Sequence, residues 1–130
     1  MITEYIHYEL GSSLEENSID LTFLCKLNDG SSYYRSYAYS EIYLPNKILD
    51  VEVYLSFRDE KLEQVNYRMG IYALNYMTDF INSLASNDDE CLLESPLTCY
   101  PRYFCTQNNI RVLLYEYKKG ELDFTVELPK

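Results

Sequence analysis

Residues 51–86, VEVYLSFRDEKLEQVNYRMGIYALNYMTDFINSLAS, contain the two clearest periodic patterns of the chain. In 51–58 every second residue is apolar, which predicts a strand with one buried face. From 60 to 86 apolar residues recur mostly at spacings of three and four, which predicts one long helix with a broad apolar stripe. Asp59 stands where a helix N-cap residue is expected, and acidic residues follow it. The segment therefore predicts a strand followed by a helix.

Two β-hairpins are predicted on either side of this segment. The first joins an alternating strand at 19–27, with one face buried, to a tyrosine-rich strand at 31–39. The second joins 110–117 to 122–128. Each pair flanks a short turn that contains glycine, which is typical of hairpin loops.

The remaining segments complete the predicted fold. Residues 2–10 predict a further strand, whereas 86–109 has no sustained period and predicts an irregular connection. Strands, then one helix, then more strands favour an α+β fold, in which an antiparallel sheet of about five to six strands carries one long helix, about 60–86, on one face. A length of 130 residues, 47% of them hydrophobic, predicts a single domain spanning 1–130.

The chain is strongly acidic. It has 21 acidic and 11 basic residues, which give a formal net charge of -10. This charge repels phosphate backbones, so direct binding to nucleic acid is not expected. It speeds association with a basic protein, although acidity can also serve solubility alone. The charge therefore favours a basic protein partner.

Targeting signals and cysteines point to the cytoplasm. No apolar run approaches the roughly 20 residues that cross a bilayer, and the N-terminus lacks the pattern of a secretory signal, so no membrane partner is expected. The four cysteines, Cys25, Cys91, Cys99 and Cys105, form no CxxC pair and are expected to be reduced thiols. A Cys99–Cys105 disulfide is the alternative if a leader has been removed.

Signatures of catalysis and of cofactors are missing from the sequence. His7 is the single histidine, and no serine or cysteine stands in a nucleophile-elbow context. The glycines form no phosphate-binding loop, and the acidic run 88–90 lacks the spacing of a calcium loop. We therefore expect no catalytic, cofactor-binding or metal-binding residues. A small enzyme that works with carboxylates alone stays open, because such a site has no local motif.

Tyrosine is the unusual component: the chain has 15 tyrosines and no tryptophan. Tyrosine is enriched at interfaces because it offers a large rigid surface with a polar tip. Tyr33, Tyr37 and Tyr39 share one face of their predicted strand, where both core and interface roles are open. Tyr72 and Tyr76 lie on the apolar stripe of the predicted helix, and we expect them to be buried.

Carboxylates group by the same alternation. Asp50 and Glu52 flank the start of the strand at 51–58, while Glu121, Asp123 and Glu127 lie on one side of the last strand with no lysine between them. Such a row of acids gains nothing for the sheet itself, which indicates either a binding role or protection of an exposed edge. The predicted partner-binding residues are Tyr33, Tyr37, Tyr39, Asp50, Glu52, Asp123 and Glu127.

In size, acidity and composition the whole chain resembles the immunity proteins that protect bacteria from their own polymorphic or contact-dependent toxins. The resemblance implies a small cytoplasmic inhibitor that occludes the basic active site of a cognate toxin, a nuclease in particular, without a cofactor. Phage-encoded inhibitors of defence nucleases share this character and are the alternative, together with the carboxylate-dependent enzyme. The identity of the partner and the oligomeric state are left open.

Overall fold

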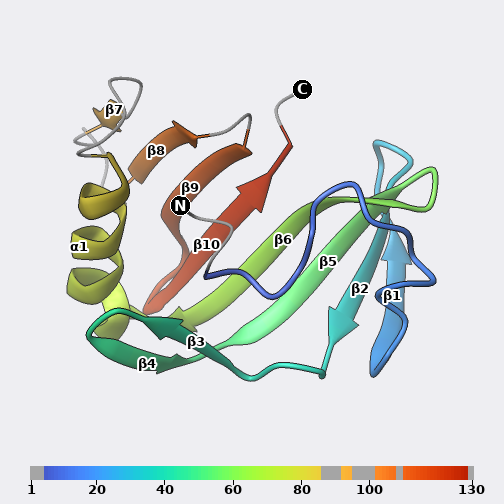
Figure 1. Cartoon of the computed structure of the whole chain (residues 1–130), viewed down its shortest axis with the longest axis horizontal. Coiled ribbons are helices and arrows are strands. Elements are labelled where there is room, and N and C mark those ends of the chain that lie inside the picture. Colours follow the sequence, from blue (N-terminus) through green and yellow to red (C-terminus); the bar gives the residue numbers. More distant parts are fainter. Residues whose placement is uncertain (1–4, 86–91, 95–101, 108–109, 129–130) are drawn as a thin grey trace.

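The computed structural model describes residues 5–85, 92–94, 102–107 and 110–128. Its main element is a curved antiparallel sheet of eight strands in the order β1-β2-β5-β6-β10-β9-β8-β7 (Figure 1). A second, two-stranded sheet pairs β3 with β4. The strands are β1 (Leu21–Lys26), β2 (Ser32–Ser36), β3 (Glu41–Leu44), β4 (Lys47–Asp50), β5 (Glu52–Arg58), β6 (Lys61–Gly70), β7 (Leu92–Glu94), β8 (Arg102–Gln107), β9 (Ile110–Lys118) and β10 (Glu121–Glu127).

The predicted α+β class is confirmed, with one helix packed on one face of the sheet. Helix α1 spans Leu74–Ala85 and follows a 3-10 turn, η2, at Ile71–Ala73. The five strands β1, β2, β5, β9 and β10 lie in segments predicted to be strands. β6 lies in the predicted helix, and β7 and β8 lie in the predicted connection. The helix is much shorter than the predicted 60–86, because 61–70 belongs to β6.

The error in the helix prediction comes from a pattern that fits two periods. Val65 and Met69 are four residues apart, as on a helix, but Tyr67 between them completes an every-second-residue pattern, and all three are buried on one face of β6. Asp59 is not a helix cap. Asp59 and Glu60 have φ values of 50° and 61°, which match a two-residue hairpin turn and reverse the chain from β5 into β6.

Both predicted hairpins and the strand at 51–58 are confirmed, but the first strand is not half buried. β1 pairs with β2 and β9 pairs with β10, each antiparallel. β1 forms the free edge of the sheet, where Phe23 is 56% exposed and Cys25 is a free, exposed thiol. A register shift between these two residues bends the strand, as β-bulges do at sheet edges.

Two further expectations need correction. Residues 5–10 do not form the predicted strand, and residues 2–4 lie outside the described part. The connection at 86–109 is not wholly irregular, since it contains β7 and β8; the remainder, which includes Cys91 and Cys99, lies outside the described residues. The small sheet of β3 and β4 was not predicted, because its apolar residues alternate over only four positions in each strand.

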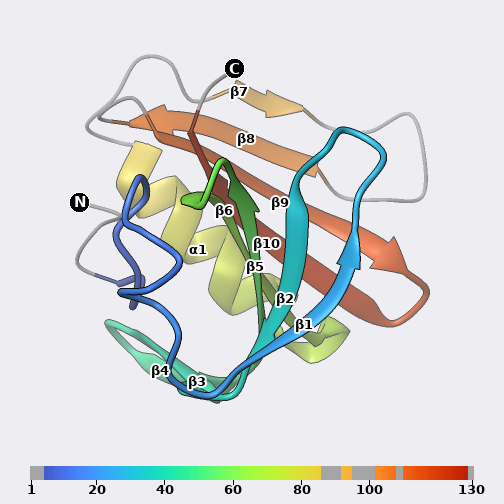
Figure 2. The same cartoon turned by 90° about the vertical axis from the view of Figure 1, so that its right-hand side faces the viewer.

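The hydrophobic core lies between one face of the large sheet and a second layer. Figures 1 and 2 show α1, the β3–β4 hairpin and the N-terminal segment gathered on this face. Phe124 of β10 lies at its centre, with ring centroids 6.1 Å from Tyr67 and 6.3 Å from Phe80 of α1. Other fully buried core residues are Ile42, Leu49, Leu55, Leu62, Met77, Ile81, Leu114 and Leu122.

Candidate functional site

The opposite face of the sheet is polar, and strand register arranges its residues in rows. Side chains that alternate with the core residues point to this face. Three rows run across neighbouring strands in β5-β6-β10-β9 order: Glu52, Arg68, Asp123 and Tyr115; Tyr54, Asn66, Thr125 and Leu113; and Ser56, Gln64, Glu127 and Arg111.

Asp123 lies in the middle of this face and is fully buried. Its carboxylate accepts hydrogen bonds from Thr125 Oγ1 at 2.7 Å and Asn66 Nδ2 at 3.1 Å, and it pairs with Arg68 Nε at 3.2 Å. The expectation that this acid gains nothing for the sheet is therefore wrong. No lysine stands between the acids of β10, but Arg68 lies directly opposite Asp123 on β6 and supplies the positive charge. Arg68 is 55 residues away from Asp123 in the sequence.

Glu127 also forms its polar contacts within the sheet. It is 7% exposed, it accepts a hydrogen bond from Gln64 Nε2 at 2.6 Å, and it pairs with Arg111, its register partner on β9. The predicted partner-binding acids Asp123 and Glu127 are therefore engaged within the chain. They link β10 to both neighbouring strands rather than forming an open acidic surface.

Tyr33 belongs to the polar face and contacts a tyrosine of the neighbouring strand β5. Its ring stacks on Tyr54 at a centroid distance of 5.5 Å and an interplanar angle of 6°. Burial raises the pKa of Tyr33 to about 12, while Arg68 acts in the opposite direction and Asp123 adds to the increase. The two charged groups that affect this pKa, Arg68 and Asp123, lie on β6 and β10, two and three strands away from β2.

Tyr37 and Tyr39 do not share a face with Tyr33, because β2 ends at Ser36. Tyr37 is 61% exposed, and the Arg35 guanidinium lies 4.8 Å from its ring centroid. Tyr39 stacks on His7 at 4.0 Å beside the N-terminal segment. The three predicted tyrosines therefore occupy different surroundings, and only Tyr33 joins the charged cluster.

Asp50 and Glu52, the other two predicted acids, are brought together with a third carboxylate in an open hollow of about 350 Å³. We call it the acidic hollow. It lies where β4 leads into β5, beside η2 and the β9–β10 turn. The hollow is lined by Asp50, Glu52, Arg68, Tyr72, Tyr117 and Glu121, together with Val51, Met69 and Gly70.

Tyrosines hold the charged groups of the acidic hollow in place. The Arg68 guanidinium carbon lies 4.4 Å from the Tyr54 ring centroid and 4.5 Å from that of Tyr117. Tyr54 and Tyr117 each donate a hydrogen bond of 2.9 Å, the first to Glu52 and the second to Glu121. Two of the three carboxylates are therefore positioned before any ligand arrives.

The electrostatics of the acidic hollow favour the ionised form of Glu121. The hydrogen bond from Tyr117 lowers the pKa of Glu121, with a smaller contribution from Lys118, 3.4 Å away. Burial and the same hydrogen bond raise the pKa of Tyr117 to about 12, so it stays a donor at neutral pH. The arrangement can accept hydrogen bonds from a cationic group and stack against it.

Sequence reasoning missed most of the acidic hollow. Arg68 and Tyr117 were not proposed because their proximity depends on the pairing of β6, β10 and β9. Tyr72 was expected in the core but is 58% exposed, since it lies in η2 before the helix proper begins. The alternation that groups Glu121 with Asp123 and Glu127 was the local signal for this part of the hollow.

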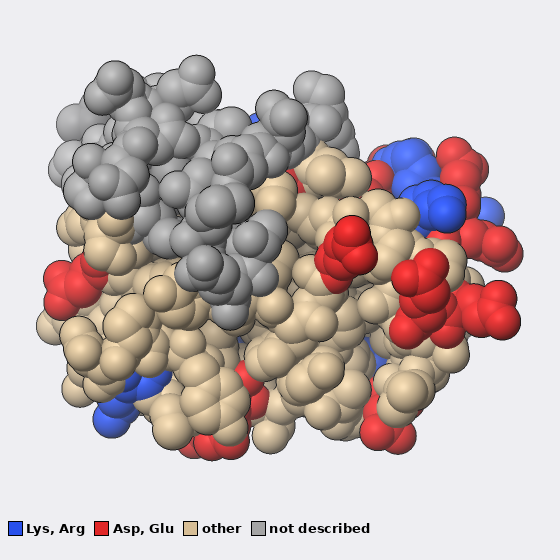
Figure 3. Space-filling model, in the orientation of Figure 1, with Lys and Arg blue, Asp and Glu red and all other residues tan. Residues whose placement is uncertain are grey.

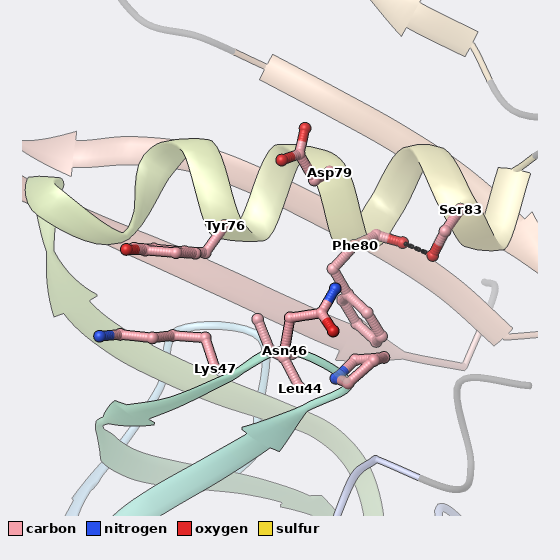
Figure 4. Close-up of a pocket in the computed structure, with 8 residues that line it drawn as sticks. Leu44, Asn46, Lys47, Tyr76, Asp79, Phe80 and Ser83 are labelled. Atoms are coloured by element: carbon pink, nitrogen blue, oxygen red, sulfur yellow. Dashed lines mark hydrogen bonds between the residues drawn. The ribbon is translucent and has the colours of Figure 1, made fainter.

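A smaller cleft of about 200 Å³ lies between α1 and the β3–β4 turn (Figure 4). Lys47 and Tyr76 run side by side at one end, with the Lys47 ammonium 5.2 Å from the ring centroid. Tyr76 is 42% exposed, so the expectation that it is buried is also wrong. Ser83 donates to the Phe80 carbonyl at 2.7 Å, and Asp79 points away from the hairpin, so these groups do not converge on a common point.

His7 and possible metal ligands were also considered. His7 stacks on Tyr39, its Nδ1 is 3.5 Å from the Tyr67 hydroxyl, and burial lowers its pKa. Among the described residues no group of three or more His, Cys, Asp or Glu side chains is placed to hold a metal ion. No helix in the same part of the chain is long and apolar enough to cross a membrane.

Comparison of the chain with protein-family models, with curated proteins and with solved structures gives no match.

Proposed function

We propose that this chain is a cytoplasmic inhibitor that neutralises a basic protein, a toxin or nuclease domain, by covering its active site. The observation that carries the proposal is the acidic hollow, in which tyrosine hydroxyls fix two of three carboxylates around the stacked Arg68. Positioned groups lose less conformational freedom on binding, which improves affinity without adding contacts. The resemblance to immunity proteins supports the same interpretation.

The overall charge supports such a partner. A net charge of -10 attracts a basic surface and raises the rate of encounter. On the side of the molecule shown in Figure 3, acidic side chains outnumber basic ones and gather toward the end that carries β1 and β2. The electrostatic field of the chain therefore guides a basic partner toward it, while the acidic hollow supplies the positioned contacts.

The direction of one pKa shift in the acidic hollow suits binding of a cation rather than a general-acid role for Glu121. A general acid in a carboxylate-dependent enzyme needs a pKa raised toward neutrality. The pKa of Glu121 is instead lowered, which keeps it ionised and suits recognition of a cation. A phage-type inhibitor of a defence nuclease uses the same surface chemistry and remains the second candidate.

Co-purification tests the proposal. The chain is produced together with the product of its neighbouring gene, and we expect a stoichiometric complex that weakens as salt is raised. The test variant combines Asp50→Asn, Glu52→Gln and Glu121→Gln. The matched control combines Asp20→Asn, Glu9→Gln and Glu15→Gln. It changes the net charge by the same amount, but at exposed positions outside the hollow.

The two triple variants separate recognition from steering. Both should slow association by similar amounts, because both reduce the negative charge by three. Only the hollow variant should dissociate much faster, by about tenfold or more, because its positioned contacts are lost. Equal dissociation rates for both variants, or the absence of any complex, would contradict the proposal.

A further inference from the structure

The acidic hollow has an aromatic wall, Tyr72, whose ring packs directly on a glycine. Gly70 has an ordinary extended backbone, with φ −68° and ψ 156°, so its conformation alone does not require glycine. A Cβ atom at this position would lie 2.8 Å from Cδ1 and 2.9 Å from Cε1 of the Tyr72 ring, which is too close for atoms that are not bonded. The lack of a side chain at position 70 therefore makes room for the ring.

This arrangement contributes little to the core. Tyr72 is 58% exposed, and it lines the acidic hollow together with Gly70. A glycine in a strand lowers stability, because it loses more conformational freedom on folding than other residues do. A glycine that admits a largely exposed ring beside a hollow indicates a binding role for that ring.

Strand register brings the aromatic wall next to the carboxylates. Gly70 stands opposite Glu121 in the pairing of β6 with β10, and Arg68 stands opposite Glu52 in the pairing of β5 with β6. The Cα atoms of such opposite residues are about 4.5–5.5 Å apart. Burial raises the pKa of Tyr117, followed by its hydrogen bond to Glu121, and the charges of both Glu121 and Glu52 add to the increase. Both carboxylates therefore lie near one tyrosine hydroxyl at the edge of the hollow.

Carboxylate oxygens at the acidic hollow are open to a further donor. The hydrogen bonds from neighbouring tyrosines end at Oε2 of Glu52 and Oε2 of Glu121, and within the described part of the chain no hydrogen bond reaches Oε1 of either residue. The ion pairs with Arg35 and Lys118, 3.7 and 3.4 Å long, are also measured to Oε2. The Asp50 side chain makes no hydrogen bond or ion pair with any described residue. The hollow therefore offers acceptors to a group with several donors.

Arg68 shows which kind of cation this surface accommodates. Its guanidinium carbon lies 4.4 Å from the Tyr54 ring centroid and 4.5 Å from that of Tyr117, and Asp123 balances its charge at 3.2 Å. The hollow beside it offers the same kinds of group, a tyrosine ring and carboxylates. A planar guanidinium stacks on a ring while its N–H groups point sideways to carboxylates, whereas an ammonium is a strongly hydrated point charge. The lining therefore suits a guanidinium better than an ammonium.

We infer that the acidic hollow binds an arginine side chain of the partner, whose guanidinium group stacks on Tyr72 and donates hydrogen bonds to the carboxylates of Glu52 and Glu121. The inference rests on the proposed function for the origin of the arginine. It deepens that function by naming the basic residue that the hollow recognises. Arginine is among the residues that contribute most to the affinity of protein interfaces.

The first experiment needs no partner. The isotope-labelled full chain is titrated with Nα-acetyl-arginine N-methylamide at constant ionic strength, and amide shifts are followed by NMR. We expect saturable shifts in the millimolar range around Glu52, Gly70, Tyr72 and Glu121. The lysine analogue should bind about threefold more weakly because it does not stack, and the neutral citrulline analogue about tenfold more weakly because it lacks the charge. Equal or tighter binding of either analogue, or no saturable shift at these residues, would overturn the inference.

Tyr72→Ala tests the aromatic wall. Because Tyr72 is largely exposed, we expect the variant to stay folded and to bind the arginine amide about fivefold more weakly. Tyr72→Phe, which keeps the ring, should recover most of that loss. The matched control is Tyr43→Ala, since Tyr43 is 56% exposed and does not line the hollow; it should bind the amide as the original protein does. Undiminished binding by Tyr72→Ala would overturn the inference.

Gly70→Ala tests the position of the ring without removing it. The φ of Gly70 suits alanine, so the variant should stay folded, but the added Cβ atom displaces the Tyr72 ring. We expect weaker binding of the arginine amide and smaller shifts at Tyr72. Binding as tight as that of the original protein would contradict stacking on the ring in its present position.

The two proposals fail in different ways. If the arginine amide binds as expected but no complex forms with the neighbouring gene product, the inhibitor proposal fails and the arginine site stands. If the complex forms and Tyr72→Ala leaves both its dissociation rate and arginine-amide binding unchanged, the arginine site fails and the inhibitor proposal stands.

Discussion

Both faces of the large sheet contain fully buried side chains, but the groups that surround these side chains differ between the two faces. Phe124 and Asp123 are neighbours on β10, both are fully buried, and they point to opposite faces. Phe124 is enclosed by other apolar side chains, whereas Asp123 is enclosed by groups that donate hydrogen bonds to it. The apolar face supplies driving force for folding. The polar face fixes which residues stand opposite one another, because a shifted register would bury an unpaired carboxylate.

The largest expected effect is on the apolar face. Phe124→Ala should lower the free energy of unfolding by about 3–5 kcal/mol, because it removes a buried ring and leaves a cavity between Tyr67 and Phe80. Denaturant unfolding followed by circular dichroism measures this change. Phe124→Leu is the control and should lose much less. A loss below about 1 kcal/mol for the alanine variant would mean that the apolar face contributes less than its burial suggests.

The next effect concerns the polar face. Asp123→Ala should cost about 2 kcal/mol, because it leaves Arg68 without its carboxylate and removes one of the two acceptors of Asn66 Nδ2. Once Asp123 is absent, Arg68→Met should cost much less than it does alone, and a double-mutant cycle measures this coupling. Glu52→Gln lies in the same row but is exposed, and it should change stability by less than about 0.5 kcal/mol. Additive effects of the two changes would contradict the proposed role of the pair in register.

A third change alters neither face. Glu60 has a φ of 61° in the turn between β5 and β6, a conformation that is unfavourable for a residue with a Cβ atom. Glu60→Gly should therefore raise the free energy of unfolding by about 1 kcal/mol. Glu60→Ala, which keeps the Cβ atom and loses the charge, should bring no such gain. If both variants gain equally, charge rather than backbone strain is the cause.

The last expected effect is confined to high pH. Burial raises the pKa of Tyr33 from 10.0 to about 12, so in the folded protein it keeps its proton where an unfolded chain has lost it. The unfolded state then binds fewer protons, and stability should fall as the pH rises from about 10 to about 12. Absorbance titration at the tyrosinate band, compared between the original protein and Tyr33→Phe, should isolate one group with a midpoint near pH 12. A midpoint at the ordinary value would show that Tyr33 is not enclosed by the polar face.

The sequence was informative where local chemistry determines structure. Turns with glycine between alternating strands identified both hairpins, because turn and strand signals lie within a few residues of each other. The helix prediction failed at 61–70, where spacings of three and four coincide with a two-residue period. There the turn at Asp59 and Glu60 decides the structure, and Glu60 stands at the second position, where a hairpin of this kind usually has glycine.

The candidate site was only partly predictable for a related reason. Asp50 and Glu52 are close in sequence, and both line the acidic hollow. The fate of Asp123 depends on Arg68, which only the pairing of β6 with β10 brings opposite it. The alternation of residues along one strand predicts which acids share a face. It does not predict which basic residue on a neighbouring strand lies beside them.

The irregular geometry of β1 affects how the protein behaves in concentrated solution. An exposed edge strand with apolar side chains such as Phe23 and Leu24 can pair with the same edge strand of another molecule. Repetition of that pairing leads to fibrils. The extra residue between Phe23 and Cys25 interrupts the even spacing of backbone donors and acceptors that such recruitment requires. A local defect in one strand thus helps to keep individual molecules apart.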